Sequence, residues 1–309
     1  TATSGSIVET TAPTSYAQVA SGSWSMYGVV YNTVDGDLEL SGVQTGQFDV
    51  SIAVYSQNFD VSSQDTQPTG LAFNADGTKM FVVGLAGRDV NEYTLSTGFD
   101  VSTASFVDSF SVAGQETSPQ GIAFNTDGTK MFVIGYDGDD VNEYLLSTGF
   151  DVSTAAFVDS FSISGQQTEP YDVAFNATGT KMYVLGRVPV SVHEYALSTV
   201  FDVSTASFTD SFSVSSQETT PKGITFNTDG TKMFVCGDTG DDVNEYALST
   251  DFDISTASFT DAFSVSSQDT APQAIAFDNT GAKMFVLGDT GDNVYEYAVG
   301  SSSTPSGYN

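Results

Sequence analysis

The sequence predicts an all-β protein, a six-bladed β-propeller made of four-stranded antiparallel blades. A segment of 51 residues recurs in a constant register, marked by Pro68, Pro119, Pro170, Pro221 and Pro272. Each copy holds four short apolar or alternating runs of strand length, and no helix-period segment interrupts them. Four antiparallel strands in a unit of about 50 residues are typical of one propeller blade. The 309 residues of the chain hold about six such units.

The four expected strands can be placed in the copy that begins at residue 121. They span 121–125, 130–135, 141–147 and 157–164. The sequence Asn-Thr-Asp-Gly at 125–128 separates the first two strands, and Tyr-Asp-Gly-Asp at 136–139 separates the second from the third. Glycine supplies the positive φ angle that such tight turns need, so each break in the pattern has the chemistry of a turn.

We expect a single propeller domain over residues 1–309, with a flexible tail at 301–309. The expected blades are 13–68, 69–119, 120–170, 171–221, 222–272 and 273–300. The first of these is degenerate, but Phe-Asp-Val-Ser at 48–51 keeps the register of the same sequence at 99–102. The last copy lacks its fourth strand, and residues 5–11 are expected to supply it, which closes the ring and removes an open edge. In an alternative five-bladed ring, residues 54–62 supply the closing strand and the first 45 residues lie outside.

Five of the eight basic residues occupy one repeat position, and a glutamate follows each of them by thirteen residues. The two positions lie on adjoining strands, so a hairpin brings them together. We expect a structural ion pair in every blade, and a ring of cations lining the channel is the functional alternative. The expected pairs are Lys79 with Glu92, Lys130 with Glu143, Lys181 with Glu194, Lys232 with Glu245, and Lys283 with Glu296.

The repeated sequence Phe-Asp-Val-Ser-Thr-Ala is interpreted as a connection between strands. Its aspartates are expected to accept hydrogen bonds from nearby backbone N–H groups, as short acidic side chains do in turns. The repeated tyrosines that follow the glutamates are expected to pack in the hydrophobic core between blades. Stacking of these rings on sugars is the alternative. These tyrosines are Tyr93, Tyr144, Tyr195, Tyr246 and Tyr297.

Charge excludes several classes of partner. The chain has 39 Asp and Glu residues against 8 Lys and Arg residues, which gives a formal net charge of −31. Nucleic acids and anionic lipid surfaces require clustered cations, so no nucleic-acid partner is expected. No stretch approaches the about 18 apolar residues of a membrane span, so no membrane insertion is expected. An acidic surface suits a saline or calcium-containing exterior, where salt screens self-repulsion.

Acidic residues gather in the loops expected on one face of the propeller. Carboxylates in flexible loops favour Ca²⁺ over transition metals, which makes Ca²⁺ the one cofactor that the pattern suggests. The spacing matches no known calcium loop, so a solvated acidic face is the alternative. Asp65, Glu116, Glu218 and Asp269 are expected to add to this face from the connections between blades. The candidate metal ligands are Asp137, Asp139, Asp140, Asp238, Asp241, Asp242, Asp289 and Asp292.

The repeat symmetry is broken most clearly at 186–195, where Arg187 and His193, the one histidine, replace the usual acidic turn and asparagine. Together with Arg88 and Lys222, these residues are candidates for binding an anionic or sugar group, and sequence drift is the alternative. The single cysteine, Cys236, takes the place of Ile134 and is expected to be a buried core thiol. No catalytic residue is assigned, because no histidine in its repeat could activate that thiol.

The repeat resembles a known group of propeller repeats. Its signature here is Pro-Gln-Gly-Ile-Ala-Phe-Asn-Thr-Asp-Gly-Thr-Lys-Met-Phe-Val at 119–133, with Val-Asn-Glu-Tyr at 141–144. This pattern is similar to the YVTN/NHL/TolB-like repeats of microbial surface-layer and secreted proteins, and long, near-identical copies are similar to repeats in marine bacterial surface proteins and phage structural proteins. The resemblance implies the fold strongly and the function weakly.

We therefore expect a non-enzymatic module located outside the cytoplasm, at a cell surface or on a virion. It would serve as a scaffold, in adhesion, or in recognition of a protein or glycan partner, as part of a longer chain or assembly. Five nearly identical copies make an asymmetric active site hard to build, because catalysis needs different groups converging on one substrate. A calcium-dependent lactonase-type hydrolase and a multivalent glycan-binding lectin are the alternatives.

Overall fold

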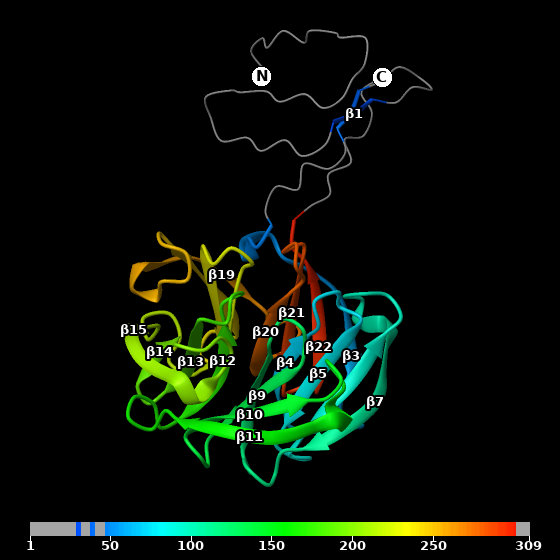
Figure 1. Cartoon of the computed structure of the whole chain (residues 1–309). Helices are drawn as coiled ribbons and strands as arrows, with labels where there is room; N and C mark the ends of the chain where they lie inside the picture. The colour runs from blue at the N-terminus through cyan, green and yellow to red at the C-terminus, as the bar shows by residue number, and fades with distance from the viewer. Residues whose placement is uncertain (1–28, 32–37, 41–46, 301–309) are drawn as a thin grey trace.

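The computed structural model describes residues 29–31, 38–40 and 47–300 (Figure 1). Residues 47–300 form five four-stranded antiparallel sheets around a common axis, and β1 (Val29–Tyr31) pairs with β2 (Leu38–Leu40) in a separate two-stranded sheet. The innermost strand of each sheet contacts those of its two neighbours, so the ring is closed. The protein is a five-bladed β-propeller, and the prediction of six blades is wrong.

The first four blades follow the chain from the axis outward. Blade I holds β4 (Pro68–Phe73), β5 (Lys79–Gly84), β6 (Asp89–Leu95) and β7 (Ala104–Ser111). Blade II holds β8 (Pro119–Phe124), β9 (Lys130–Gly135), β10 (Asp140–Leu146) and β11 (Ala155–Ser162). Blade III holds β12 (Pro170–Phe175), β13 (Lys181–Arg187), β14 (Val190–Leu197) and β15 (Ala206–Ser213). Blade IV holds β16 (Pro221–Phe226), β17 (Lys232–Gly237), β18 (Asp242–Leu248) and β19 (Ala257–Ser264).

Blade V joins the two ends of the propeller. It holds β20 (Pro272–Phe277), β21 (Lys283–Gly288) and β22 (Asn293–Ala298), and its outer strand is β3 (Val54–Asp60) from the N-terminal side. An N-terminal strand therefore closes the ring, but it is not the segment at 5–11, which lies outside the described residues. The described part of the blade expected at 13–68 does not make a blade of its own, because β3 is the fourth strand of blade V and β1 and β2 pair only with each other. The five-bladed alternative from the sequence is confirmed in this strand.

All five expected ion pairs form, with N–O distances of 2.6 to 2.8 Å. Each pair also binds the next blade. The Lys79 ammonium donates to the Phe150 carbonyl, and the second oxygen of Glu92 accepts from the Val152 N–H. The same two contacts recur around the ring. We call this arrangement of lysine, glutamate and the neighbouring Phe-Asp-Val-Ser segment the inter-blade clamp.

The clamped segment has a constant local structure. Its aspartate accepts a hydrogen bond from the N–H two residues later, as Asp100 does from Ser102, and so caps a short 3₁₀ helix. These helices are η1 (Val50–Ile52), η2 (Val101–Thr103), η3 (Val152–Thr154), η4 (Val203–Thr205) and η5 (Ile254–Thr256). The phenylalanine before each aspartate has a positive φ, 57° at Phe99. Its ring lies against Gly77, where an added Cβ would come within 2.2 Å of the ring.

The hydrophobic core lies between adjacent blades as five clusters. The five repeated tyrosines are fully buried in these clusters, so they are core residues as expected. Cys236 is a buried free thiol in the cluster between blades IV and V, as the sequence also predicts. No helix among the described residues is long and apolar enough to span a membrane.

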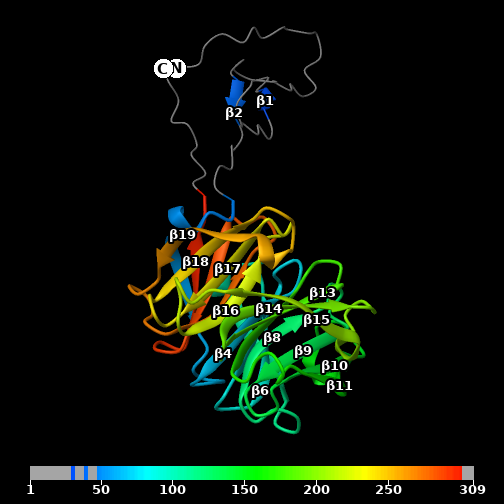
Figure 2. The ribbon, with the colours of Figure 1, turned by 90° about the vertical axis from the view of Figure 1, so that its left-hand side faces the viewer.

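The propeller has two distinct ends. The β4–β5 turn and the β6–β7 connection meet at one end, where the Phe99 N–H donates to the Gly77 carbonyl; we call this end the clamp face. The β5–β6 turn and the connection that precedes β4 meet at the other end, where the Gly87 N–H donates to Asp65; we call it the mouth face. Both Phe48 and Val299 bind backbone of the β20–β21 turn. The propeller therefore begins and ends at the clamp face (Figures 1 and 2).

Candidate functional site

Side chains that differ between the repeats surround a cavity of about 140 Å³ at the mouth face, which we call the mouth cavity. The second residue of each inner strand contributes to it. Because every inner strand starts at this face, the five positions converge around the axis, and each blade can place a different group there. These residues are Thr69, Gln120, Tyr171, Lys222 and Gln273. Gln67, Leu85, Tyr136 and Asp289 complete the lining.

Lys222 and Tyr171 contact each other in the wall of the mouth cavity. The Lys222 ammonium lies 4.4 Å from the centre of the Tyr171 ring, a cation–π contact. It is also 3.5 Å from Asp238, and the Lys222 side chain is only 14% exposed. Tyr136 packs edge-on against Tyr171 with ring centres 5.1 Å apart. These contacts hold the lysine and the two aromatic rings in place. The ammonium has three N–H donors, so it can still donate to a ligand.

Two cations near the mouth cavity are each paired with a carboxylate, and Asp289 adds a further negative charge. Arg187 pairs with Glu169 at 2.6 Å, and Lys222 lies beside Asp238. Burial raises the pKa of Asp238, and Lys222 opposes that rise. Burial followed by the Asp269 charge raises the pKa of Asp289. One oxygen of Asp238 is buried without a hydrogen-bond partner, so this carboxylate can accept a further donor.

Acidic residues in the connections between blades are buried, in contrast to the expected acidic face. Asp65, Glu116, Glu218 and Asp269 are each no more than 2% exposed. They accept hydrogen bonds from backbone N–H groups of the turn beside them, as Glu116 does from Ser118 and Asp137. These carboxylates therefore hold the turns of the mouth face, and they do not form a solvated surface.

In the connection that precedes blade III, an amide, Gln167, takes the place of these buried carboxylates. Gln167 donates to the Pro189 carbonyl at 2.9 Å and accepts from the Val188 N–H at 3.0 Å. The turn containing Val188 and Pro189 thus presents both an acceptor and a donor to this side chain. A carboxylate could satisfy only the donor, which explains why this repeat carries glutamine.

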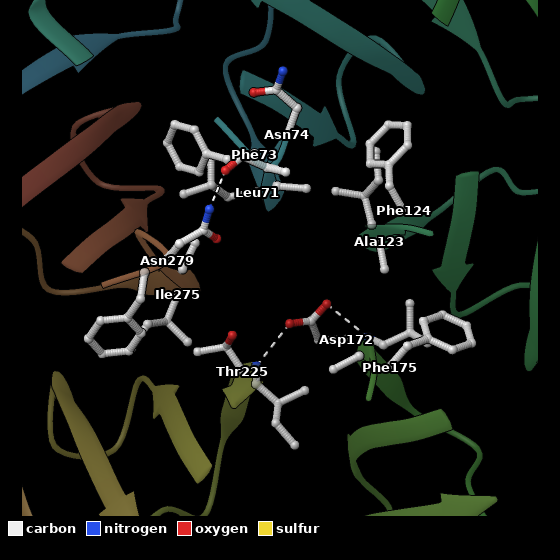
Figure 3. A pocket seen from close by; sticks show the side chains of 18 of the residues that line it. Leu71, Phe73, Asn74, Ala123, Phe124, Asp172, Phe175, Thr225, Ile275 and Asn279 are labelled. Carbon is white, nitrogen blue, oxygen red and sulfur yellow. Dashed lines mark hydrogen bonds between the residues drawn. The ribbon is translucent and has the colours of Figure 1, made fainter. Parts of the chain in front are cut away.

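A second cavity, of about 250 Å³, occupies the channel on the clamp-face side and is called the channel cavity (Figure 3). Its wall is formed by the later residues of the inner strands, with Asn74 and Asn279 at the clamp-face end. Asp172 is the one carboxylate among its lining residues. It stands where three of the other blades have glycine and blade V has Ala274.

Asp172 is 7% exposed and joins two blades. One carboxylate oxygen accepts from the Val173 N–H and the other from the Ile224 N–H of blade IV, both at 2.8 Å (Figure 3). Burial raises its pKa to about 7, although both hydrogen bonds oppose that rise. Gly121 faces it, and a Cβ there would meet its oxygen at 2.4 Å, so the glycine makes room for this carboxylate.

The candidate metal ligands do not gather into one centre. In residues 29–31, 38–40 and 47–300, no three His, Cys, Asp or Glu side chains lie close enough to hold a metal ion. Asp140 and Asp242 begin strands and accept from Asn142 and Asn244. Asp137 accepts from Thr117, and Asp238 binds Lys222. Asp139, Asp241 and Asp292 have positive φ angles in the turns, and Asp289 lines the mouth cavity.

The candidate binding residues divide into two groups. Lys222 lines the mouth cavity, Arg187 ends β13 on the same face, and Arg88 lies in the β5–β6 turn of that face. The five other basic residues are all clamp lysines, so every cation outside the clamps is on the mouth face. His193 is separate: it is buried in β14 with Ser191 2.9 Å from its Nε2, and burial lowers its pKa.

Sequence reasoning missed the mouth residues Gln120, Tyr136, Tyr171 and Gln273, and it missed Asp172. None of these carries a motif of its own. Their signal is visible when the repeats are compared position by position, because these positions vary while the proline that begins each inner strand and the lysine that begins each second strand do not.

No protein-family model matches the chain, and no curated protein is similar to it. Solved structures are similar at low identity. One is a functionally unknown protein from Desulfotomaculum acetoxidans, 14% identical over 72% of this chain and 62% of its own, with a TM-score of 0.45. A protein from Lactobacillus plantarum is 15% identical over 77% of this chain and 68% of its own, with a TM-score of 0.48.

A third similar structure is the periplasmic gluconolactonase of Pseudomonas aeruginosa, 16% identical over 76% of this chain and 69% of its own, with a TM-score of 0.44. This chain thus spans less than two thirds of the first of these proteins and slightly more of the other two. At such identities and TM-scores the likenesses carry no argument about activity.

Proposed function

We propose that the protein is a non-enzymatic recognition module that binds its partner at the mouth face and works outside the cytoplasm. One observation carries this proposal. The five repeats keep the same clamp residues, yet at the second position of the inner strand they place a hydroxyl, two amides, a phenol and an amine around one cavity. Packing alone, which is the same in every blade, does not require that variety.

The position of the chain ends supports this role. The propeller begins at Phe48 and ends near Val299, and both lie at the clamp face. Sequence that flanks the propeller therefore joins it at the end opposite the mouth. A propeller attached through its clamp face presents the mouth cavity to a partner without obstruction from its own attachment.

The lactonase alternative has less support. A metal-dependent hydrolase needs several ligands around one ion, and no three His, Cys, Asp or Glu side chains of the described residues gather in this way. Asp172 is a single buried carboxylate, and the groups that touch it are backbone N–H groups. At Asp172 there is therefore no nucleophile in contact with a base, which hydrolysis without a metal would need. The hydroxyl and imidazole that are in contact with each other, those of Ser191 and His193, are both buried in β14 and line neither cavity.

The proposal is tested with wild-type protein, the mouth variant Tyr136→Ala/Lys222→Ala, and the clamp-face variant Asn279→Ala. Each is measured for saturable binding to an array of bacterial surface polysaccharides and surface proteins, after its fold is checked by circular dichroism. We expect the wild type and Asn279→Ala to bind the same members of the array, and the mouth variant to lose them. Equal binding by all three proteins would refute recognition at the mouth face.

A further inference from the structure

We propose that the mouth cavity binds one uncharged sugar ring, a neutral hexopyranose at the end of a glycan. This inference rests on the proposed function and specifies the ligand of the same site. The volume of about 140 Å³ is the first argument. Pockets for drug-sized ligands have about 300–1,000 Å³, so this cavity suits a single ring and is too small for a peptide.

The polar groups of the mouth cavity match the hydroxyls of a sugar. Gln120 and Gln273 each bring an amide that can donate and accept, and Thr69 adds a hydroxyl. The Lys222 ammonium adds further N–H donors. A sugar hydroxyl both donates and accepts, so it can satisfy such mixed groups at once. The Gln120 and Gln273 amides already donate to the Ser118 and Ala271 carbonyls, and each keeps a second N–H and its carbonyl oxygen for a sugar hydroxyl. The Thr69 hydroxyl donates to the Pro119 carbonyl and can still accept.

The electrostatics disfavour a charged ligand. An anion would meet Asp238 and Asp289 and the field of a chain with a net charge of −31. A cation would meet the Lys222 ammonium, which is held in place by Tyr171. The opposite charges therefore favour a neutral, polar ligand at this cavity.

Aromatic rings provide the remaining element of a sugar site. Tyr136 and Tyr171 both line the mouth cavity and pack edge-on against each other. Lys222 lies over the buried Tyr171 ring, whereas Tyr136 is partly exposed and offers its ring to a ligand. The C–H face of a pyranose ring packs against aromatic side chains, and pre-arranged rings lose little entropy on binding. Because Tyr136 and Tyr171 have no aromatic equivalent in blades I, IV and V, the protein has one such site on its axis and not five equivalent sites between blades.

The test is a titration of the full chain, followed by NMR, with the methyl glycosides of glucose, galactose and mannose. Glucuronic acid and glucosamine serve as the charged probes. We expect at least one neutral glycoside to bind saturably with a Kd of about 1 mM, the strength ordinary for a ligand of this size. The double variant Gln120→Ala/Gln273→Ala is expected to weaken binding of the neutral glycoside at least about tenfold. The charged probes are expected to bind the wild type at least about tenfold more weakly than the neutral glycoside does.

Asn279→Ala is the matched control, because it alters the channel cavity at the opposite end. Unchanged affinity in this variant together with weakening in the glutamine variant supports the mouth cavity as the sugar site. Equal weakening in both would move the sugar to the channel and overturn the inference. Mouth-dependent binding to the array without saturation by any neutral glycoside would also overturn it, while leaving the proposed function intact.

Discussion

Glu92 in blade I accepts a hydrogen bond from the Val152 N–H of blade II at 3.0 Å, and its other oxygen contacts Lys79 at 2.6 Å. The same glutamate thus belongs to an ion pair within its blade and to the contact between blades. Because Glu92 is buried, both oxygens need partners, and the clamp supplies one to each. The ion pair is therefore the means by which adjacent blades are held in register.

This geometry predicts that Glu92→Gln destabilises the protein by about 1–3 kcal/mol, since the amide nitrogen cannot accept a hydrogen bond where the carboxylate did. Urea unfolding measures the loss. Asp108→Asn, which removes an exposed carboxylate on β7, is the control and should change stability little. A Glu92→Gln protein as stable as wild type would show that the clamp contributes nothing to blade packing.

The closing segment should be as important as the clamps. Phe48 is 7% exposed, its ring lies 5.3 Å from that of Phe277, and its carbonyl accepts from Lys232. Phe48→Ala is expected to cost about 3–5 kcal/mol, the range for a buried aromatic residue. Phe106→Ala, at a ring that is 45% exposed, should cost clearly less in the same thermal unfolding measurement. Equal losses would contradict closure of the ring by the N-terminal segment.

The repeat unit could be predicted from sequence, but the number of blades could not. Strand lengths, turns and the Lys79–Glu92 pair follow from local pattern, which every copy repeats. Residues 48–60 have the pattern of a fourth strand whether they complete a blade of their own or the last one. Only the pairing of β3 with β22 distinguishes these cases, and that pairing joins distant parts of the chain.

The candidate site was predictable only in part. Lys222 and Arg187 attract notice because cations are rare in this chain. Gln120 and Tyr171 have ordinary strand chemistry, and their importance arises from convergence around the axis. That convergence depends on the direction of the inner strands, which composition and spacing do not reveal.

The matching of Gln167 to its turn gives a further prediction. Gln167→Glu places a carboxylate oxygen opposite the Pro189 carbonyl, where the amide now donates at 2.9 Å. Two acceptors would then face each other, and we expect a loss of about 1–3 kcal/mol in thermal unfolding. Gln115→Glu makes the same charge change at an exposed site in the connection between β7 and β8 and should be nearly neutral. Similar effects of the two substitutions would refute this account of blade III.

Asp172 predicts how stability depends on pH. Burial raises its pKa to about 7 in the folded protein, above the ordinary value of 3.8, so the folded state holds this proton more tightly than the unfolded state. The stability from Asp172 is therefore fully present below about pH 4 and is lost as the pH rises toward and through 7.

Asp172→Gly restores the residue that blades I, II and IV carry and removes this titration. Because other carboxylates also titrate, the quantity to measure is the difference in unfolding free energy between Asp172→Gly and wild type by urea denaturation. Relative to wild type, the variant should gain up to about 4 kcal/mol between pH 4 and pH 8, since one pKa unit corresponds to about 1.4 kcal/mol. The buried Cys236 thiol does not interfere, because burial and the Asp172 charge keep its pKa above that interval. A difference that stays constant with pH would mean that Asp172 is already ionised at pH 4 in the folded protein, held so by its hydrogen bonds to Val173 and Ile224.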